Sequence, residues 1–415
     1  LSLRRQRQMC IRDRPKTHRL IPMKNTRLFQ NLILALVFVF ITGCAVSFSK
    51  KKWDLPPIAD NEISVMSFNM ENLFDTVKTP GHNDETYLPR YMKEGDKSLR
   101  EACMKENDST YRQNECLNTN WTPDALDTKL TNISKVVMDI DGRGPDNLMI
   151  MEIESDVVLK QLNDHLKDAK YITQVIIDGP DKRGINVAFL SRFPMVGKPV
   201  LHPIPWKPEN PKDKEWMERS RRILEVTVKA PNGDPITFLV GHFPSQANPT
   251  YWRQQIAQFA VDLIKAKGPN AMVVFGGDLN ISHEEEEKAH IFRDILSKGG
   301  AVSHFVGCKE CPGSHNYRKS WSFLDAHVYS PALLADGAGS YQMEPGTIDV
   351  IRYNPVHLYK GKYPKRWDYE AKEGVSDHFP LYVRLKQRSE AKTPVKEEKS
   401  VEKTPAKKSK AKKKK

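Results

Sequence analysis

The feature that most constrains this chain is a succession of short apolar runs rich in β-branched and aromatic residues. Runs of this length predict β-strands, and we expect nine of them, at residues 63–69, 147–153, 172–178, 185–191, 223–230, 236–243, 271–277, 323–330 and 379–385. Apolar residues at helical spacing predict helices at 128–140, 155–168 and 251–267. So many strands with so few helices favour a four-layered α/β sandwich, two packed mixed β-sheets flanked by helices, over a doubly wound parallel sheet.

The chain length of 415 residues is sufficient for one large domain with terminal extensions. We place this domain at 61–386, after a linker at 45–60, and interpret its polar segment 78–125 as an insertion that forms a loop excursion at the sheet rim. The Lys-rich segment 387–415 contains no aromatic residue and is predicted to be disordered.

The N-terminal region has the pattern of an export signal. Residues 1–22 show no apolar periodicity and are interpreted as an upstream segment that is not part of the natural product, whereas residues 23–44 combine a basic start, an apolar run and Thr42-Gly43-Cys44. This ending resembles a bacterial lipobox, which implies acylation of Cys44, attachment to a membrane and an extracytoplasmic location in the bacterial cell envelope, periplasmic or at the cell surface. A plain signal peptide and an uncleaved anchor are the alternatives.

Export would permit disulfides, and four further cysteines form two local candidate pairs, Cys103 with Cys116 and Cys308 with Cys311. Cys308 and Cys311 could instead be half of a zinc site or a redox pair, although no second Cys/His pair with matching spacing follows them. The sequence leaves the connectivity open.

The net charge of +13 belongs to the ends of the chain. Residues 1–53 contribute +11 and residues 387–415 contribute +8, which leaves −6 for residues 54–386. An acidic core that acts on phosphate esters must screen its own carboxylates, which a bound divalent cation can do. The basic tail can hold the chain near polyanions through counterion release, or it can simply keep the chain soluble.

Polar side chains recur at the ends of the predicted strands, where they can point into a common cleft. They are Asn69, Glu152, His242, Asp278 with Asn280, Asp325, and Asp377 with His378. Carboxylates, imidazoles and amides without a thiolate suit Mg²⁺, with Mn²⁺ and Ca²⁺ as alternatives, better than a structural zinc ion. Such a group can provide an in-line water, a base and relief of charge on phosphoryl oxygens.

The order of these motifs resembles the endonuclease/exonuclease/phosphatase superfamily, which includes pancreatic-type deoxyribonucleases, abasic-site endonucleases, neutral sphingomyelinases and inositol polyphosphate phosphatases. The resemblance covers residues 63–385. It is carried by Ser67-Phe68-Asn69, Met151-Glu152-Ile153-Glu154, Arg183-Gly184, Gly241-His242-Phe243-Pro244, Gly277-Asp278-Leu279-Asn280, Phe323-Leu324-Asp325 and Ser376-Asp377-His378-Phe379. Met151 and Gly241 stand where the family often has Gln and Asn, which implies one lost hydrogen bond to the metal ligand and one lost phosphate contact.

The resemblance implies roles for the individual residues. Glu152 would bind the metal, with Asn69 beside it and Asp377 as a further ligand, while Asp377 would also orient His378 as general base or phosphate partner. His242 would be the second catalytic histidine, Asp278 would orient the attacking water or a second metal, and Asn280 would donate to the transition-state oxygens. Asp325 would support the second histidine or a second metal, although Asp349 competes for this role.

Several basic and aromatic residues are candidates for substrate binding. Tyr317, Arg318 and Trp321 form a cluster that could stack on bases or contact a sugar, and core packing is the competing explanation for Trp321. Arg183 belongs to the motif set. Arg219, Arg221 and Arg222 could line a phosphate groove or pair with local acids.

From these residues we predict a monomeric, metal-dependent phosphodiester hydrolase, an extracytoplasmic endonuclease that cleaves nucleic acid by in-line attack of water. The alternatives are a lipid or small-molecule phosphodiesterase, an inositol-phosphate-type phosphatase, and a non-catalytic protein that binds phosphate-bearing ligands.

Overall fold

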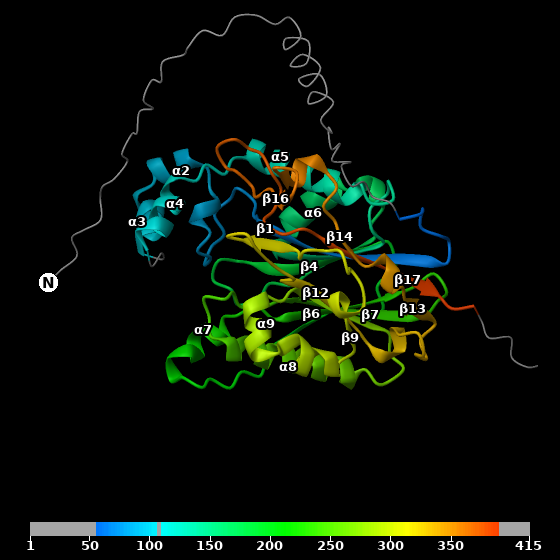
Figure 1. The fold of residues 1–415 in the computed structure, drawn as a ribbon. Coiled ribbons are helices and arrows are strands. Elements are labelled where there is room, and N and C mark those ends of the chain that lie inside the picture. Colours follow the sequence, from blue (N-terminus) through cyan, green and yellow to red (C-terminus); the bar gives the residue numbers. More distant parts are fainter. Residues whose placement is uncertain (1–54, 106–108, 390–415) are drawn as a thin grey trace, which may run out of the picture. The chain divides into compact units, whose positions relative to one another are not determined.

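The computed structural model describes residues 55–105 and 109–389, and it contains two large mixed β-sheets packed face to face (Figure 1). The predicted signal peptide, Cys44 and nearly all of the Lys-rich tail lie outside the described residues. Within the described residues, no helix combines the length and apolar character needed to cross a membrane.

The first sheet has the strand order β13-β17-β1-β2-β4-β3, with β14 also paired to β17. Its central strands β1 (Glu62–Leu73) and β2 (Asn147–Ile153) run parallel to each other. The other pairs are antiparallel and involve β3 (Thr173–Ile176), β4 (Asn186–Ser191), β13 (Tyr341–Met343), β14 (Asp349–Val350) and β17 (Leu381–Gln387).

The second sheet repeats this plan in the order β5-β6-β7-β8-β12-β9. Its parallel pair is β7 (Pro235–His242) with β8 (Val273–Asp278). Antiparallel pairing joins the remaining strands, β5 (Val200–His202), β6 (Ile223–Lys229), β9 (Ala301–Val302) and β12 (Asp325–Tyr329). Each sheet therefore has one parallel pair inside an otherwise antiparallel arrangement.

Three apolar layers hold the domain together. The middle layer lies between the sheets and joins Met149, Met151 and Phe189 of the first to Phe238 and Val274 of the second. The outer face of the first sheet is covered by α5 (Pro123–Met138) and α6 (Asp156–His165), and that of the second by α8 (Thr250–Ala266). This arrangement confirms the predicted four-layered α/β sandwich.

The long helices begin where local chemistry favours a helix start. The side chain of Thr122 accepts a hydrogen bond from the backbone N–H of Ala125, and Pro123 follows as the first residue of α5. Ser155 caps α6 in the same way. In α8 the buried residues Ile256, Ala260 and Ile264 recur at helical spacing, as the sequence predicts.

The segment predicted as a loop excursion is largely helical, which corrects the expectation for residues 78–125. It contains α2 (Arg90–Gly95), α3 (Lys97–Lys105) and α4 (Thr110–Asn118), and a disulfide joins Cys103 of α3 to Cys116 of α4. The start of α5 also falls within the predicted insertion. The structure pairs the other two candidate cysteines as well, Cys308 with Cys311.

Candidate active site

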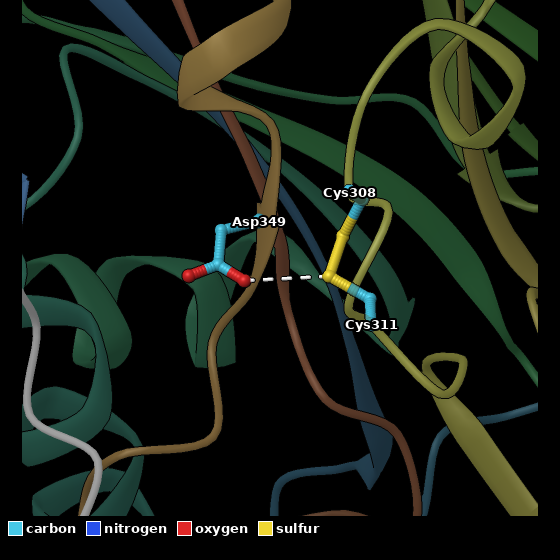
Figure 2. Close-up of side chains that lie close together, drawn as sticks. All are labelled: Cys308, Cys311 and Asp349. Carbon is cyan, nitrogen blue, oxygen red and sulfur yellow. Dashed lines mark hydrogen bonds between the residues drawn. A yellow bond between two sulfur atoms is a disulfide. The ribbon is translucent and has the colours of Figure 1, made fainter.

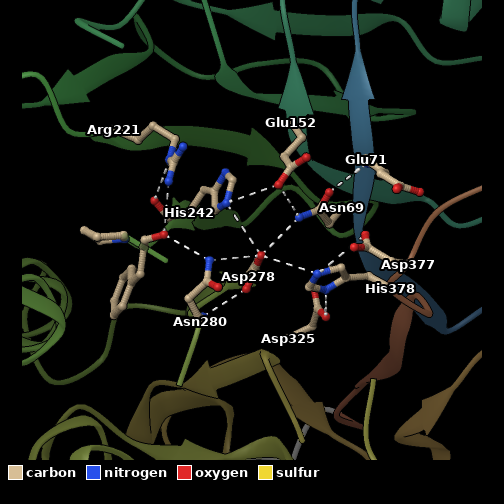
Figure 3. Close-up of polar contacts among 12 residues, drawn as sticks. Asn69, Glu71, Glu152, Arg221, His242, Asp278, Asn280, Asp325, Asp377 and His378 are labelled. Atoms are coloured by element: carbon tan, nitrogen blue, oxygen red, sulfur yellow. Dashed lines mark hydrogen bonds and ion pairs between the residues drawn. The ribbon is translucent and has the colours of Figure 1, made fainter. Parts of the chain in front are cut away.

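The polar residues predicted for the site lie together at one edge of the sandwich, because the directions of their strands bring them there. The parallel strands β1, β2, β7 and β8 carry Asn69, Glu152, His242 and Asp278 at or near their C-terminal ends. Strand β12 is antiparallel to β8, so its first residue, Asp325, lies directly opposite Asp278 in the register. His378 precedes β17, which is antiparallel to β1, and so arrives at the same edge. Figure 3 shows these side chains converging.

Glu152 is directed into the site by an irregular backbone. The β1–β2 register shifts between Asn69 and Leu73, and Glu152 itself adopts a φ of 60°, in the left-handed region. Such bulges redirect side chains at functional sites. The carboxylate of Glu152 then accepts hydrogen bonds from the Asn69 side-chain amide at 3.1 Å and from the Asn72 backbone N–H at 2.9 Å.

Asp278 lies at the centre of the site and is almost fully buried. Its Oδ2 accepts hydrogen bonds from the amides of Asn69 (3.0 Å) and Asn280 (3.2 Å). The Nε2 atoms of His242 and His378 lie 3.5 Å and 3.8 Å from the same oxygen. Burial raises the pKa of Asp278 to about 7, so this carboxylate can accept a proton near neutral pH.

His378 is held by Asp325. Its Nδ1 and Asp325 Oδ2 form a 2.7 Å hydrogen bond, whereas the carboxylate of Asp377 lies 3.9 Å from Nε2 of the same ring. The expectation that Asp377 orients this imidazole is therefore corrected, and so is the expectation that Asp325 supports the second histidine, His242: Asp325 holds His378. The competing residue Asp349 lies elsewhere, with its Oδ1 3.4 Å from Cys311 Sγ of the disulfide (Figure 2).

The two histidines have opposite electrostatic surroundings. Burial opposes charge on His378, but the negative charges of Asp325 and Asp278 raise its pKa well above the ordinary value. Burial and the positive charge of Arg221 lower the pKa of His242 well below that value. Of the two roles that the sequence left open for His378, this favours the phosphate partner, because an imidazolium attracts anionic oxygens and cannot accept a proton.

The donor set fits a hard divalent cation. Oxygen or nitrogen atoms of Glu152, His242 and Asp278 lie within 4.8 Å of one another, and so do those of a second group, His315, Asp377 and His378. Within the described residues, the buried Nδ1 of His242 has no hydrogen-bond partner. Asn69 turns its amide N–H towards the carboxylates of Glu152 and Asp278, so in this arrangement it positions both of them.

The site opens into a cleft of about 690 Å³ that contains several arginines. Arg183, predicted from its motif, lines this cleft together with Arg221 and Arg366. Arg221 lies 3.2 Å from Asp181, and Arg366 bridges Glu71 (2.7 Å) and Asp377 (3.5 Å). The sequence analysis did not predict Arg366 or His315 as site residues. The basic and aromatic residues next to Arg366 could have indicated its place in a substrate cleft.

The predicted substrate cluster divides in the structure. Tyr317 is 62% exposed and lines the cleft, and the guanidinium of Arg318 lies over its ring at 5.1 Å. Trp321 instead stacks on Tyr363 and Phe379 and packs against the core between the sheets. Core packing therefore accounts for Trp321, and its predicted substrate contact is corrected.

The departure at Gly241 has a packing reason. A Cβ at position 241 would lie 2.9 Å from the Phe275 ring. The neighbouring Gly277 is required as well, because the Gly241 carbonyl leaves no space for a side chain there. Met151, the other departure, is buried between the sheets and gives Glu152 no hydrogen-bonding side chain.

The sequence profile of the Endonuclease/Exonuclease/phosphatase family matches residues 101–387. The chain belongs to this family, whose members are phosphoester hydrolases that typically use a divalent metal. The resemblance seen in the motifs is thereby confirmed.

Solved structures with a similar fold include three with low sequence identity. A humanized TDP2 from D. rerio is 13% identical, with 79% of this chain and 100% of that chain covered and a TM-score of 0.48. A Bacteroides thetaiotaomicron endonuclease/exonuclease/phosphatase family protein is 16% identical (79% and 98% covered, TM-score 0.48). A mannosyl-6-phosphatase of the same species is 17% identical (78% and 99% covered, TM-score 0.45). No curated protein matches the chain.

Proposed function

We propose that this protein is a Mg²⁺-dependent phosphodiester hydrolase that cleaves nucleic acid outside the cytoplasm by in-line attack of water. The observation that carries the proposal is the convergence of Glu152, Asp278 and the Asp325–His378 pair on one point of a cleft. These groups would hold a cation, accept a proton from the attacking water and relieve the charge on the phosphoryl oxygens.

Each group has a definite task in this reaction. Glu152, aligned by Asn69 and Asn72, would hold the cation, which when bound polarises the phosphoryl oxygens. Asp278 would orient the attacking water and accept its proton, and Asn280 is positioned beside it. His378, kept charged by Asp325, would pair with a phosphate oxygen as negative charge develops.

Nucleic acid is favoured as substrate by the composition of the cleft. Arg183 and Arg366 have partly exposed side chains that would contact phosphates, and the exposed ring of Tyr317 would stack on a base. The Lys-rich segment after residue 387 would add attraction to a polyanion without sequence preference.

To test the substrate class, the full-length protein would be incubated with plasmid DNA, RNA, sphingomyelin and inositol phosphates, each with Mg²⁺, Mn²⁺, Ca²⁺ or EDTA. The proposal predicts EDTA-sensitive cleavage of nucleic acid, including nicking of the closed plasmid, and no action on the lipid. Cleavage of lipid or inositol phosphate alone would show that the proposed substrate class is wrong. Inactivity on every substrate would favour a ligand-binding protein.

The extracytoplasmic location is supported by two disulfides, since such bonds persist in oxidising compartments. Acylation of Cys44 would attach the chain to the membrane. We predict that Cys44→Ala releases the protein into the soluble fraction, measured by detergent partitioning. Unchanged partitioning of Cys44→Ala would contradict the anchor.

A further inference from the structure

Two exposed tyrosines from different elements line the cleft. Among the large apolar side chains that are exposed in the described residues, Tyr111 of α4 and Tyr317 of β10 (His315–Tyr317) are the ones that line it. Their exposed fractions are 72% and 62%. An exposed aromatic ring beside a phosphoesterase site is suited to stacking on a flat ring of the substrate.

Tyr111 lies towards the Glu152 end of the site. Its helix, α4, also places Arg112 and Glu115 in the cleft wall. Tyr87, another cleft residue, belongs to the 3-10 helix η1 (Glu85–Tyr87), which α4 contacts. Its ring stacks on Phe74 with the centroids 4.0 Å apart, and Phe74 follows Leu73, which pairs with Ile153 next to Glu152. Tyr87 therefore links α4 to the Glu152 end of the site.

Tyr317 lies towards the His378 end. It belongs to a hairpin formed by β10 and β11 (Ser320–Ser322). The first residue of this hairpin, His315, pairs with His378 across a β-bridge, with the two ring centroids 4.9 Å apart. Ser314, immediately before it, accepts a hydrogen bond from the backbone N–H of Asp325. The two tyrosines thus approach the reacting centre from opposite ends.

The wall formed by α4 is firmly attached to the domain. The Cys103–Cys116 disulfide joins α4 to α3, and Lys93 of α2 donates hydrogen bonds to the carbonyls of Cys116 and Thr119 at 2.6 Å and 2.7 Å. Arg90 donates to the carbonyl of Asn118, at the end of α4, and also contacts Glu370. A wall held in this way can present Tyr111 in a fixed position.

We propose that Tyr111 and Tyr317 stack on the bases on the two sides of the scissile phosphate, and that the protein therefore prefers single-stranded nucleic acid to an intact duplex. This inference rests on the proposed nuclease function. In a duplex each base face is covered by its neighbours, whereas a single strand can turn its bases onto aromatic side chains. The arginines of the cleft would bind the backbone of either form, so the tyrosines would supply the discrimination.

The test compares Tyr111→Ala with Tyr91→Ala in the full-length protein. Tyr91 is a matched control, because it belongs to α2 of the same insertion, is 69% exposed and is not among the residues that line the cleft. The substrates are a short single-stranded oligodeoxynucleotide, the same sequence as a duplex, and a strand of the same length in which abasic spacers replace all the nucleotides.

We expect the wild type and Tyr91→Ala to cleave the single strand faster than either the duplex or the abasic strand. Tyr111→Ala should lose roughly 10-fold or more in kcat/KM on the single strand, the effect of losing one stacked base, and remain within about twofold on the abasic strand. If Tyr111→Ala loses kcat/KM equally on the single strand and the abasic strand, or on neither, the stacking inference is wrong but the proposed nuclease function stands. Failure of the wild type to cleave any of the three would overturn the proposed nuclease function as well.

Discussion

Asp278 is a buried carboxylate that faces two imidazoles of different charge. His242 lies on the arginine side of the cleft, where burial and Arg221 keep it neutral. His378 lies on the acidic side, where Asp325 and Asp278 together outweigh the cost of burying its charge. The same residue type can therefore serve as a neutral ligand at one end of the site and as a cation at the other.

At the residue scale, Asp325→Asn should lower kcat by about 10²-fold or more, because the amide can hold the imidazole but cannot stabilise its charge. The pKa of His378 should also fall, so the pH dependence of kcat/KM that arises from this group should move to lower pH. Asp349→Asn, which removes the competing carboxylate, should keep normal rates. An Asp325→Asn enzyme with an unchanged rate and pH profile would refute the assigned role.

The sequence predicted most of the site residues but paired one of them wrongly. Asp377 precedes His378 directly, yet it lies in a bend that brings its carboxylate 3.5 Å from Arg366 and 3.9 Å from His378 Nε2, away from the Nδ1 atom that Asp325 holds. The Asp325–His378 contact joins residues 53 positions apart and depends on β12 lying beside β8. Arg366 could not be placed, because it lies on a segment without strand or helix periodicity.

At the element scale, the insertion shows how helices can form without an apolar stripe. The buried residue of α3 is Cys103 and that of α4 is Cys116. Periodicity detects helices through repeated apolar positions, so a single buried cysteine per helix gives no signal. The disulfide contributes the stability that an apolar face would otherwise provide.

The variant Cys103→Ser/Cys116→Ser should loosen this insertion selectively. A disulfide that closes a loop of this length contributes about 3 kcal/mol, so amide hydrogen exchange in α3 and α4 should become much faster while the exchange of β1, β2, β7 and β8 stays slow. The control is Met104→Ser, which alters an exposed residue of α3 without breaking the crosslink. Equal loss of protection in the insertion and in both sheets would show that the insertion is not a separate unit of stability.

At the scale of the whole molecule, strand periodicity predicted the architecture well. The nine expected strands correspond to β1, β2, β3, β4, β6, β7, β8, β12 and β17, most within two residues at each end. The additional strands are two or three residues long, and their pairing stabilises them more than local propensity does. β9 and β14 pair with the longer strands β12 and β17, whereas β10 and β11 pair with each other in a hairpin. One of these short strands carries the cleft residue Tyr317.

The interface between the sheets contains a buried, neutral imidazole. His327 of β12 forms a 2.8 Å hydrogen bond with Ser67 of β1, and burial lowers its pKa to about 3. Because this value lies below the ordinary 6.5, the stabilising effect of a neutral His327 is present above pH 6.5 and is lost as the pH falls towards 3.

Replacing His327 with a residue that does not titrate should therefore reduce the loss of unfolding free energy at acidic pH. Between pH 8 and pH 5, we expect His327→Gln to lose about 2 kcal/mol less of its free energy of unfolding than the wild type, measured by urea denaturation. His283→Gln, a change at a helix start on the surface, should follow the wild-type curve. Parallel curves for wild type and His327→Gln would contradict a neutral buried imidazole.

The most direct test of the central claim is the metal dependence of hydrolysis in Glu152→Gln. Protein stripped with EDTA would be titrated with Mg²⁺ while cleavage of single-stranded DNA is followed, with Glu284→Gln, a carboxylate at the cleft wall, as the control. The account predicts that stripped wild type is inactive and recovers with Mg²⁺, as does the control, and that Glu152→Gln requires at least about 10-fold more Mg²⁺ or fails to recover. Activity in EDTA, or a Mg²⁺ requirement unchanged in Glu152→Gln, would contradict it.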